Sequence, residues 1–175
     1  PGERGPGDEG VEDDQHELGL LARERGVDVV HATPAVLTRL TSTVTPQGIV
    51  GVAPFVDVPL ARLPSTGSVA VLHEVRDPGN AGTIVRSADA AGATGVVFST
   101  SSVDLYNTKT VRASAGSVFH VPVVRATETP AAIEYLRGEG FRIVAMDAAG
   151  EEPLYETDVQ RPVAFVFGNE AAGVP

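Results

Sequence analysis

Continuous apolar runs alternate with segments of helical periodicity over the second half of the chain. Because a strand with both faces in the core of a parallel sheet is apolar throughout, these runs predict buried parallel strands. Between them, residues 81–91 place small and branched apolar side chains on one helical face, and residues 130–137 start with Thr129 as N-cap and Pro130 in the first turn. The pattern predicts an α/β fold, a mostly parallel sheet flanked by helices. The predicted strands are residues 69–75, 95–98, 119–124, 141–146 and 162–168.

The pattern before residue 69 is weaker. Residues 18–30 predict a short helix running into a strand, residues 34–40 predict a second helix that starts at Pro34, and residues 49–52 are strand-like. Residues 59–68 contain two prolines, one glycine and three serine or threonine residues, which predicts a linker. The stretch 18–58 is too small to bury a core by itself.

Negative charge is concentrated at the amino-terminal end of the chain. Of the net charge of −10, residues 1–17 carry −6, with seven acidic residues and one basic residue, so the remaining 16 acidic and 12 basic residues give −4. This acidic lead, rich in glycine and proline, is predicted to be disordered. Because phosphate binding depends on Lys and Arg, an RNA site in the rest of the chain would have to be a local basic patch.

Composition also bears on compartment and metals. The chain has no cysteine, which excludes disulfides and thiolate metal sites and is typical of a reducing cytoplasm. It has no apolar run of eighteen residues and no signal-peptide pattern, so we expect a cytoplasmic protein. The four histidines, His16, His31, His73 and His120, lack metal-ligand spacing, and we expect no metal site.

The first candidate site is the turn and helix start after the first predicted strand. Residues 77–79 (Asp-Pro-Gly) predict a tight turn, Asn80 a helix cap, and Gly82 a place where another backbone or a ligand approaches. Arg86 lies on the second helical turn. The alternative is an ordinary strand–turn–helix corner in which Arg86 pairs with Asp89 on a solvated face.

A second candidate lies between the second and third predicted strands. Residues 107–117 are small, polar and basic, which suits a loop whose backbone N–H groups, with Lys109 and Arg112, receive phosphates. A solvated connection between two strands is an equally good interpretation.

The third candidate follows the last predicted strand, where Phe167 leads into Gly168, Asn169 and Glu170. Ligands of open α/β sheets bind outside the carboxyl ends of strands, and glycine leaves room for one there. The alternative is a strand exit that is merely capped by glycine.

Together the three stretches resemble the SpoU family of RNA 2′-O-ribose methyltransferases, a branch of the knotted SPOUT superfamily. The family's first motif, Asn-x-Gly-x-x-x-Arg, matches residues 80–86, its basic middle stretch ends in residues 114–117 (Ser-Ala-Gly-Ser), and its second motif matches residues 167–173. Order and spacing agree across residues 69–175, and three matches on one chain are far more specific than one. Residues 18–58 look like the last third of an L30e-like RNA-recognition domain.

The resemblance implies a function and a set of site residues. The function is S-adenosylmethionine-dependent methylation of a ribose 2′-OH in RNA, with ribosomal RNA favoured over transfer RNA. The implied catalytic residues are Arg86, Asn80 and Glu170. The implied RNA-binding residues are Lys109, Arg112 and Ser114. The implied cofactor-binding residues, acting largely through backbone, are Ala145, Met146, Asp147, Gly168 and Asn169.

The family's third motif, a helix start containing Ser-Leu-Asn, does not occur in residues 1–175. We therefore expect the methyltransferase domain, residues 69–175, to be truncated here, and the knot, a complete cofactor site and the usual homodimer to need residues after Pro175. One alternative is a non-catalytic RNA-binding or dimerising relative of the same fold. A dinucleotide-dependent oxidoreductase is disfavoured, because residues 79–82 lack the G-x-G-x-x-G spacing and the second strand ends in Ser99-Thr100 rather than an acid.

Overall fold

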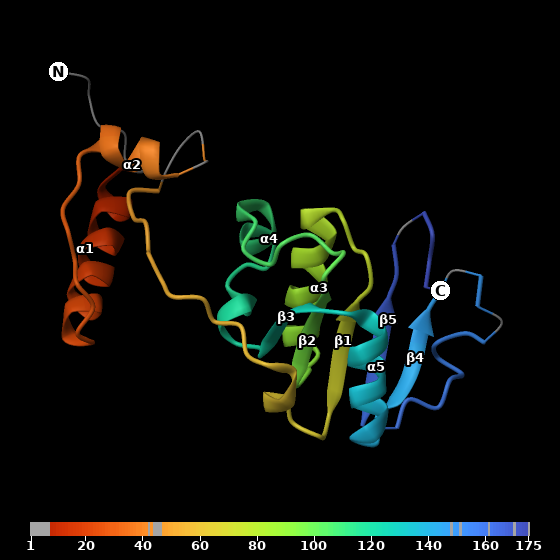
Figure 1. Ribbon diagram of the computed structural model, residues 1–175. Coiled ribbons are helices and arrows are strands. Elements are labelled where there is room, and N and C mark those ends of the chain that lie inside the picture. The colour runs from red at the N-terminus through yellow and green to blue at the C-terminus, as the bar shows by residue number, and fades with distance from the viewer. Residues whose placement is uncertain are drawn as a thin grey trace. The chain divides into compact units, whose positions relative to one another are not determined.

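The chain forms two compact units, residues 1–54 and 55–175, in the computed structural model (Figure 1). The residues that the structure describes are 8–41, 43, 47–147, 149–150, 152–160, 162–169 and 171–174. Among the helices so described, none is both long and apolar enough to cross a membrane.

The first unit contains the helices α1 (Asp8–Glu24) and α2 (Pro34–Leu40). Helix α2 was predicted, but the expected disorder is wrong for residues 8–17, which form the first part of α1. The strands expected at residues 27–30 and 49–52 are absent. A strand needs a hydrogen-bonded neighbour, and the described part of this unit offers none.

The second unit is built on a parallel sheet, and within the described residues this sheet has five strands in the order β3-β2-β1-β5-β4. This confirms the predicted α/β class. The third strand starts four residues later than predicted, because residues 117–119 form a 3-10 helix instead. The strands are β1 (Ser68–Leu72), β2 (Gly95–Ser99), β3 (Val123–Thr127), β4 (Arg142–Met146) and β5 (Val163–Phe167).

The helices of this unit start at capping residues that the sequence pattern placed differently. Asp77, not Asn80, caps the first helix, since its carboxylate accepts a hydrogen bond from the backbone N–H of Asn80 at 2.9 Å. A helix replaces the predicted loop at residues 108–113, where the Asn107 side chain caps the first turn. The helices are α3 (Pro78–Ala90), α4 (Thr108–Ala113), α5 (Thr129–Gly138, with Glu128 rather than Thr129 at the N-cap), η1 (Leu60–Arg62) and η2 (Ser117–Phe119).

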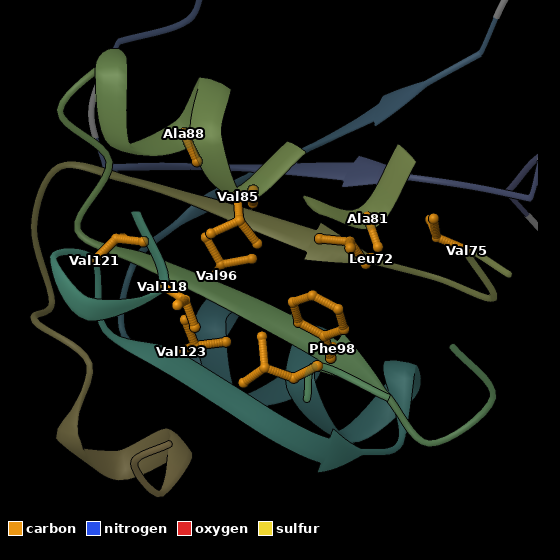
Figure 2. Packing of buried hydrophobic residues seen from close by; sticks show 12 residues of the cluster. Leu72, Val75, Ala81, Val85, Ala88, Val96, Phe98, Val118, Val121 and Val123 are labelled. Atoms are coloured by element: carbon orange, nitrogen blue, oxygen red, sulfur yellow. The ribbon is translucent and has the colours of Figure 1, made fainter. Parts of the chain in front are cut away.

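Two hydrophobic clusters cover the two faces of the sheet, which explains why the strands are apolar throughout. In β1, Ala70 and Leu72 join the cluster that contains α3, whereas Val69 and Val71 join the cluster that contains α5. Figure 2 shows Leu72 and Phe98 packed beneath α3. The predicted linker, residues 59–68, is part of this unit: it contains η1, and the side chain of Leu63 is buried against Gly95.

The strand order creates a switch point between β1 and β5. The chain runs outward from β1 to β3, crosses to β4 at the opposite edge and returns inward to β5, which pairs with β1. Where the strand order of an open α/β sheet reverses, a crevice forms at the carboxyl ends of the strands, and ligands bind there.

Gly82 lets α4 approach α3, as predicted for a close backbone contact. A Cβ atom at this position would overlap the carbonyl oxygen of Thr110 and lie 2.9 Å from the backbone nitrogen of Ser114. Gly82 of the first motif therefore allows α3 and α4 to pack closely against each other.

We expect Gly82→Ala to lower the free energy of unfolding by about 1–3 kcal/mol, although alanine is the better helix former. The overlap is with backbone, which cannot turn aside as a side chain can. Denaturant unfolding measures the change. Gly138→Ala is the control, since a Cβ there meets nothing within 4 Å, and it should leave stability unchanged or slightly raised. Equal unfolding free energies for both variants would contradict this packing role.

Candidate functional site

A hollow of about 300 Å³ lies at the switch point and is called the switch-point hollow below. The first turns of α3 and the carboxyl ends of β4 and β5 line it, so the first and second motifs meet there. Its size is at the lower end of the range for small-molecule sites. Its lining is mostly apolar, with two polar side chains, and consists of Val75, Asn80, Thr83, Ile84, Met146, Phe167 and Gly168.

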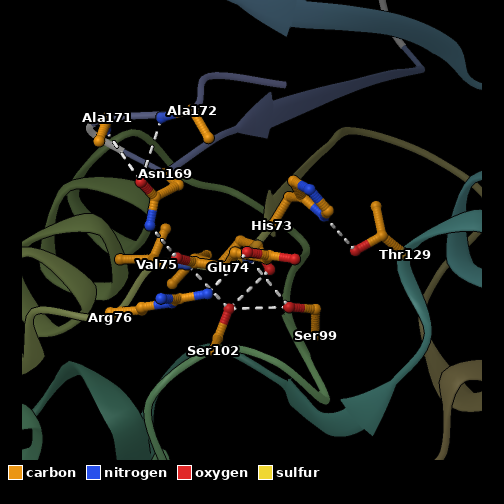
Figure 3. Close-up of polar contacts among 11 residues, drawn as sticks. His73, Glu74, Val75, Arg76, Ser99, Ser102, Thr129, Asn169, Ala171 and Ala172 are labelled. Carbon is orange, nitrogen blue, oxygen red and sulfur yellow. Dashed lines mark hydrogen bonds and ion pairs between the residues drawn. The ribbon is translucent and has the colours of Figure 1, made fainter. Parts of the chain in front are cut away.

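A larger hollow of about 510 Å³ lies on the α5 face, between His73 and the start of α5. The Nδ1 atom of His73 lies 2.9 Å from the hydroxyl of Thr129 (Figure 3). None of its lining residues was predicted as a site residue. We place the candidate site in the smaller hollow because the sequence motifs converge on that one.

The predicted residues are distributed unevenly around the switch-point hollow. Asn80, Met146 and Gly168 line it. Arg86 is exposed on α3, one turn beyond Thr83 and outside the lining. Glu170 lies outside the described residues. The remaining predicted cofactor residues directly follow or precede lining positions in the chain; these are Ala145, Asp147 and Asn169.

Asn169 holds the loop after β5 in shape. Its side-chain oxygen accepts hydrogen bonds from the backbone N–H groups of Ala171 at 2.9 Å and Ala172 at 3.2 Å, and its backbone pairs with Gly173 in both directions. Its side-chain amide donates to the carbonyl of Glu74 at 3.0 Å (Figure 3). Since these bonds occupy its polar groups, Asn169 shapes the site and ties the loop to the segment that follows β1.

Glu74 and two serines form a network that the sequence reasoning missed. Glu74 has a φ of 53°, a strained value for a residue other than glycine. Its N–H donates to Ser99 Oγ at 3.1 Å, and the Ser99 and Ser102 hydroxyls are 2.9 Å apart (Figure 3). Because Ser102 donates its own proton to the carbonyl of Leu72, Ser99 is the donor between the serines. The only sequence signal was a serine at the end of a buried strand, Ser99, with a second serine three residues later, Ser102.

The basic middle stretch lies against the start of α3. The Lys109 ammonium is 3.3 Å from the Asp77 carboxylate, and both side chains are largely exposed. The backbone N–H of Asn80, and then Lys109, lower the pKa of Asp77 and keep it ionised. Arg112 is exposed on the last turn of α4.

Two expectations for these residues need correction. Ser114, expected to bind RNA, is only 1% exposed, and its hydroxyl donates to the carbonyl of Val111 at 2.7 Å, so it stabilises the end of α4. Asp89 does not pair with Arg86 on a solvated face. It lies 3.2 Å from Nδ1 of His120, and its pKa is lowered by hydrogen bonds from Ser117 and His120.

Arg86 remains available for a ligand. In the part of the chain that the structure describes, no carboxylate pairs with its guanidinium. The same residues contain no group of three or more His, Cys, Asp or Glu side chains placed to hold a metal ion.

Both units match known protein families. Residues 67–175 match the SpoU rRNA Methylase family, and residues 8–58 match the family described as RNA 2′-O ribose methyltransferase substrate binding. The chain is 35% identical over 151 residues to the 23S rRNA (guanosine(2553)-2′-O)-methyltransferase RlmP of Bacillus subtilis, covering 86% of this chain and 59% of that protein. It is 30% identical to the 23S rRNA (uridine(2479)-2′-O)-methyltransferase of Streptomyces viridochromogenes, covering 93% of this chain and 61% of that protein.

Solved structures of related methyltransferases are also similar to this chain. The AdoMet-bound rRNA methyltransferase from Sinorhizobium meliloti superposes with a TM-score of 0.80 at 36% identity, over 93% of this chain and 63% of that one. The chain thus spans about three fifths of the length of the relatives it matches.

Proposed function

Because the chain belongs to the SpoU rRNA methylase family, we propose that the complete protein transfers a methyl group from S-adenosylmethionine to a ribose 2′-OH of ribosomal RNA. The observation that carries this proposal is the meeting of the first and second motifs in one hollow at the switch point. The names of the similar proteins favour ribosomal over transfer RNA, since two of them act on 23S rRNA.

The residues of the switch-point hollow fit the proposed methyl donor. Val75, Ile84 and Phe167 give apolar surface for a nucleoside, and Gly168 leaves the backbone approachable. We propose that the backbone of residues 145–147 and of Gly168 holds the donor, and that Asn169 keeps the loop after β5 closed. When bound, S-adenosylmethionine supplies the methyl group from its sulfonium.

Arg86 is proposed to act on the acceptor. Transfer to a hydroxyl needs the donor and acceptor in line and requires the 2′-OH to lose its proton. A guanidinium stays protonated at neutral pH, so it is a poor general base. Its positive charge instead binds the neighbouring phosphate and stabilises the developing alkoxide, and the proton of the 2′-OH passes to solvent water. Asn80 is proposed to set the position of Arg86, and Glu170 to orient Arg86 or the substrate.

RNA phosphates are proposed to bind at Lys109 and Arg112, and the first unit is proposed to add RNA contacts as the partial L30e-like region. The Lys109–Asp77 ion pair does not oppose this role, because an exposed pair contributes little free energy and a phosphate can replace the carboxylate. Ser114 is left out because it is buried. A cytoplasmic homodimer is the proposed assembly, and light scattering on the complete protein tests its dimeric state.

Two measurements test the function. Titration of labelled S-adenosylmethionine into the complete protein should show saturable binding, and mapping of 2′-O-methyl groups in RNA from cells with and without the gene should show one ribosomal position that is lost. A protein that binds RNA but neither binds the donor nor changes any position would be a non-catalytic relative. Loss of a transfer RNA methyl group would instead correct the substrate.

A further inference from the structure

The hydroxyl of Tyr106 holds a segment that is distant in the sequence. It accepts hydrogen bonds from the backbone N–H groups of Val56 at 2.7 Å and Asp57 at 2.9 Å, and it donates to Oδ1 of Asp57 at 2.7 Å. A phenolic hydroxyl has one proton to donate and two lone pairs. All three are used here, so the hydroxyl fixes two consecutive residues.

Side chains around Tyr106 strengthen this contact. The ring of Phe55 stacks on Tyr106 with centroids 4.4 Å apart, and the Arg125 guanidinium lies 5.1 Å from the Phe55 centroid and 5.2 Å from that of Tyr106. The Nε atom of Arg125 is 3.6 Å from the second carboxylate oxygen of Asp57. Residues 55–57, here called the clamped segment, are therefore held by stacking, by charge and by hydrogen bonds.

The protonation states favour the clamp at neutral pH. The hydrogen bond from Tyr106, helped by the charge of Arg125, lowers the pKa of Asp57, so its carboxylate stays ionised. Burial, followed by the hydrogen bond to Asp57, raises the pKa of Tyr106, so its phenol keeps the proton that it donates.

The clamped segment has a special position in the chain, because Phe55 is the first residue of the second unit. The next fixed backbone contact is at Val58, whose N–H donates to the carbonyl of Val123 on the edge strand β3 at 2.8 Å. Releasing residues 55–57 would add three residues to the stretch that joins α2 to the second unit, a reach of about 10 Å at most. The hydroxyl of Tyr106 thus sets where the connection to the first unit begins.

We propose that Tyr106 is a positioning residue that shortens the connection between the two units. An RNA that the first unit has bound then has a higher effective concentration at the switch-point hollow. Effective concentration falls as a connection becomes longer than the span it must bridge, so a released segment weakens the binding of an RNA that contacts both units. Chemistry on RNA already in place does not change. The RNA part of this inference rests on the proposed function, whereas the clamp itself does not.

The test compares Tyr106→Phe with Tyr155→Phe in the complete protein. Tyr106→Phe removes the hydroxyl and keeps the ring, and Tyr155 is a matched control because its side chain is fully exposed. In Tyr106→Phe the amides of Val56 and Asp57 should exchange hydrogen at least about tenfold faster. The KM for a ribosomal RNA fragment should rise by a factor of about 1.3, as expected when three residues are added to the 14-residue stretch 41–54 that follows α2. The kcat value and the affinity for S-adenosylmethionine should not change, and the control should match the wild type throughout.

Each other outcome counts against the proposal. Unchanged amide exchange would show that the hydroxyl does not hold the segment. Faster exchange with an unchanged KM would reduce the clamp to a local stabilising contact, and a fall in kcat would place Tyr106 in the catalytic machinery. If the wild type transfers no methyl group, the proposed function fails. The positioning role is then judged by the dissociation constant of the same RNA fragment, which should also rise by a factor of about 1.3.

Discussion

Replacing Arg86 with alanine is expected to lower the kcat for methyl transfer by the complete protein about a thousandfold, while the affinity for S-adenosylmethionine stays within a few-fold. The loss is large because a cation that stabilises charge developing in the transition state contributes on the order of a hundredfold to a thousandfold. Donor affinity is spared because Arg86 lies outside the lining of the switch-point hollow. Single-turnover methylation and calorimetry with the donor measure the two quantities separately.

Two further variants decide how Arg86 acts. Arg86→Lys keeps the charge but loses the planar donor set, so it should recover only part of the rate. Arg62→Ala removes an exposed arginine from η1, next to Leu63, which packs at the amino end of β2 and away from the hollow, and it should behave as wild type. Near-normal turnover by Arg86→Ala would refute the catalytic assignment, and a matching loss of donor affinity would move Arg86 to the donor side.

The sheet could be predicted because burial on both faces leaves a strong trace in the sequence. Each residue of β1 is buried, with alternate side chains entering opposite clusters, so no polar position interrupts the run. Helix α3 was equally clear, since Ala81, Val85 and Ala88 share the face that packs on the sheet.

Elements that depend on one local hydrogen bond were harder to predict. Helix α4 has six residues, and its start is fixed by the side chain of Asn107, which suits a loop as well as a cap. The same ambiguity explains why Asn80 was predicted as the cap of α3, whereas Asp77 is the observed cap. Either side chain can accept a hydrogen bond at a helix start.

The sequence motifs contain residues that line the switch-point hollow, but the contacts that support this hollow were not predicted. Asn80, Met146 and Gly168 meet in one hollow, because parallel strands end at the same edge of the sheet. The contacts that hold this edge join residues far apart in the chain, such as Asn169 and Glu74. For Ser114 the prediction failed in another way. The small, polar stretch around it suits phosphate binding, but the Ser114 side chain itself is buried by packing.

Replacing Gly168 with alanine is expected to lower kcat/KM for methyl transfer by about a hundredfold while the core stays folded. A Cβ atom at this position would overlap the backbone carbonyl group of Gly173 and lie 2.7 Å from the nitrogen of Val174. The loop could accept alanine only by moving Gly173, which would break its paired hydrogen bonds to Asn169 and shift one wall of the hollow. A displacement of about 1 Å at a supporting residue can cost a hundredfold in rate.

Steady-state kinetics and donor calorimetry on the complete protein measure this effect, and thermal unfolding checks the fold. The matched control is Gly138→Ala, which adds the same methyl group where nothing lies within 4 Å and should keep wild-type kinetics. Most of the loss should appear as weaker donor binding, because the alanine side chain would displace the loop that is proposed to hold the donor. Wild-type donor affinity in Gly168→Ala would mean that the loop after β5 does not form the donor site, since the backbone overlap leaves that loop no way to keep its shape.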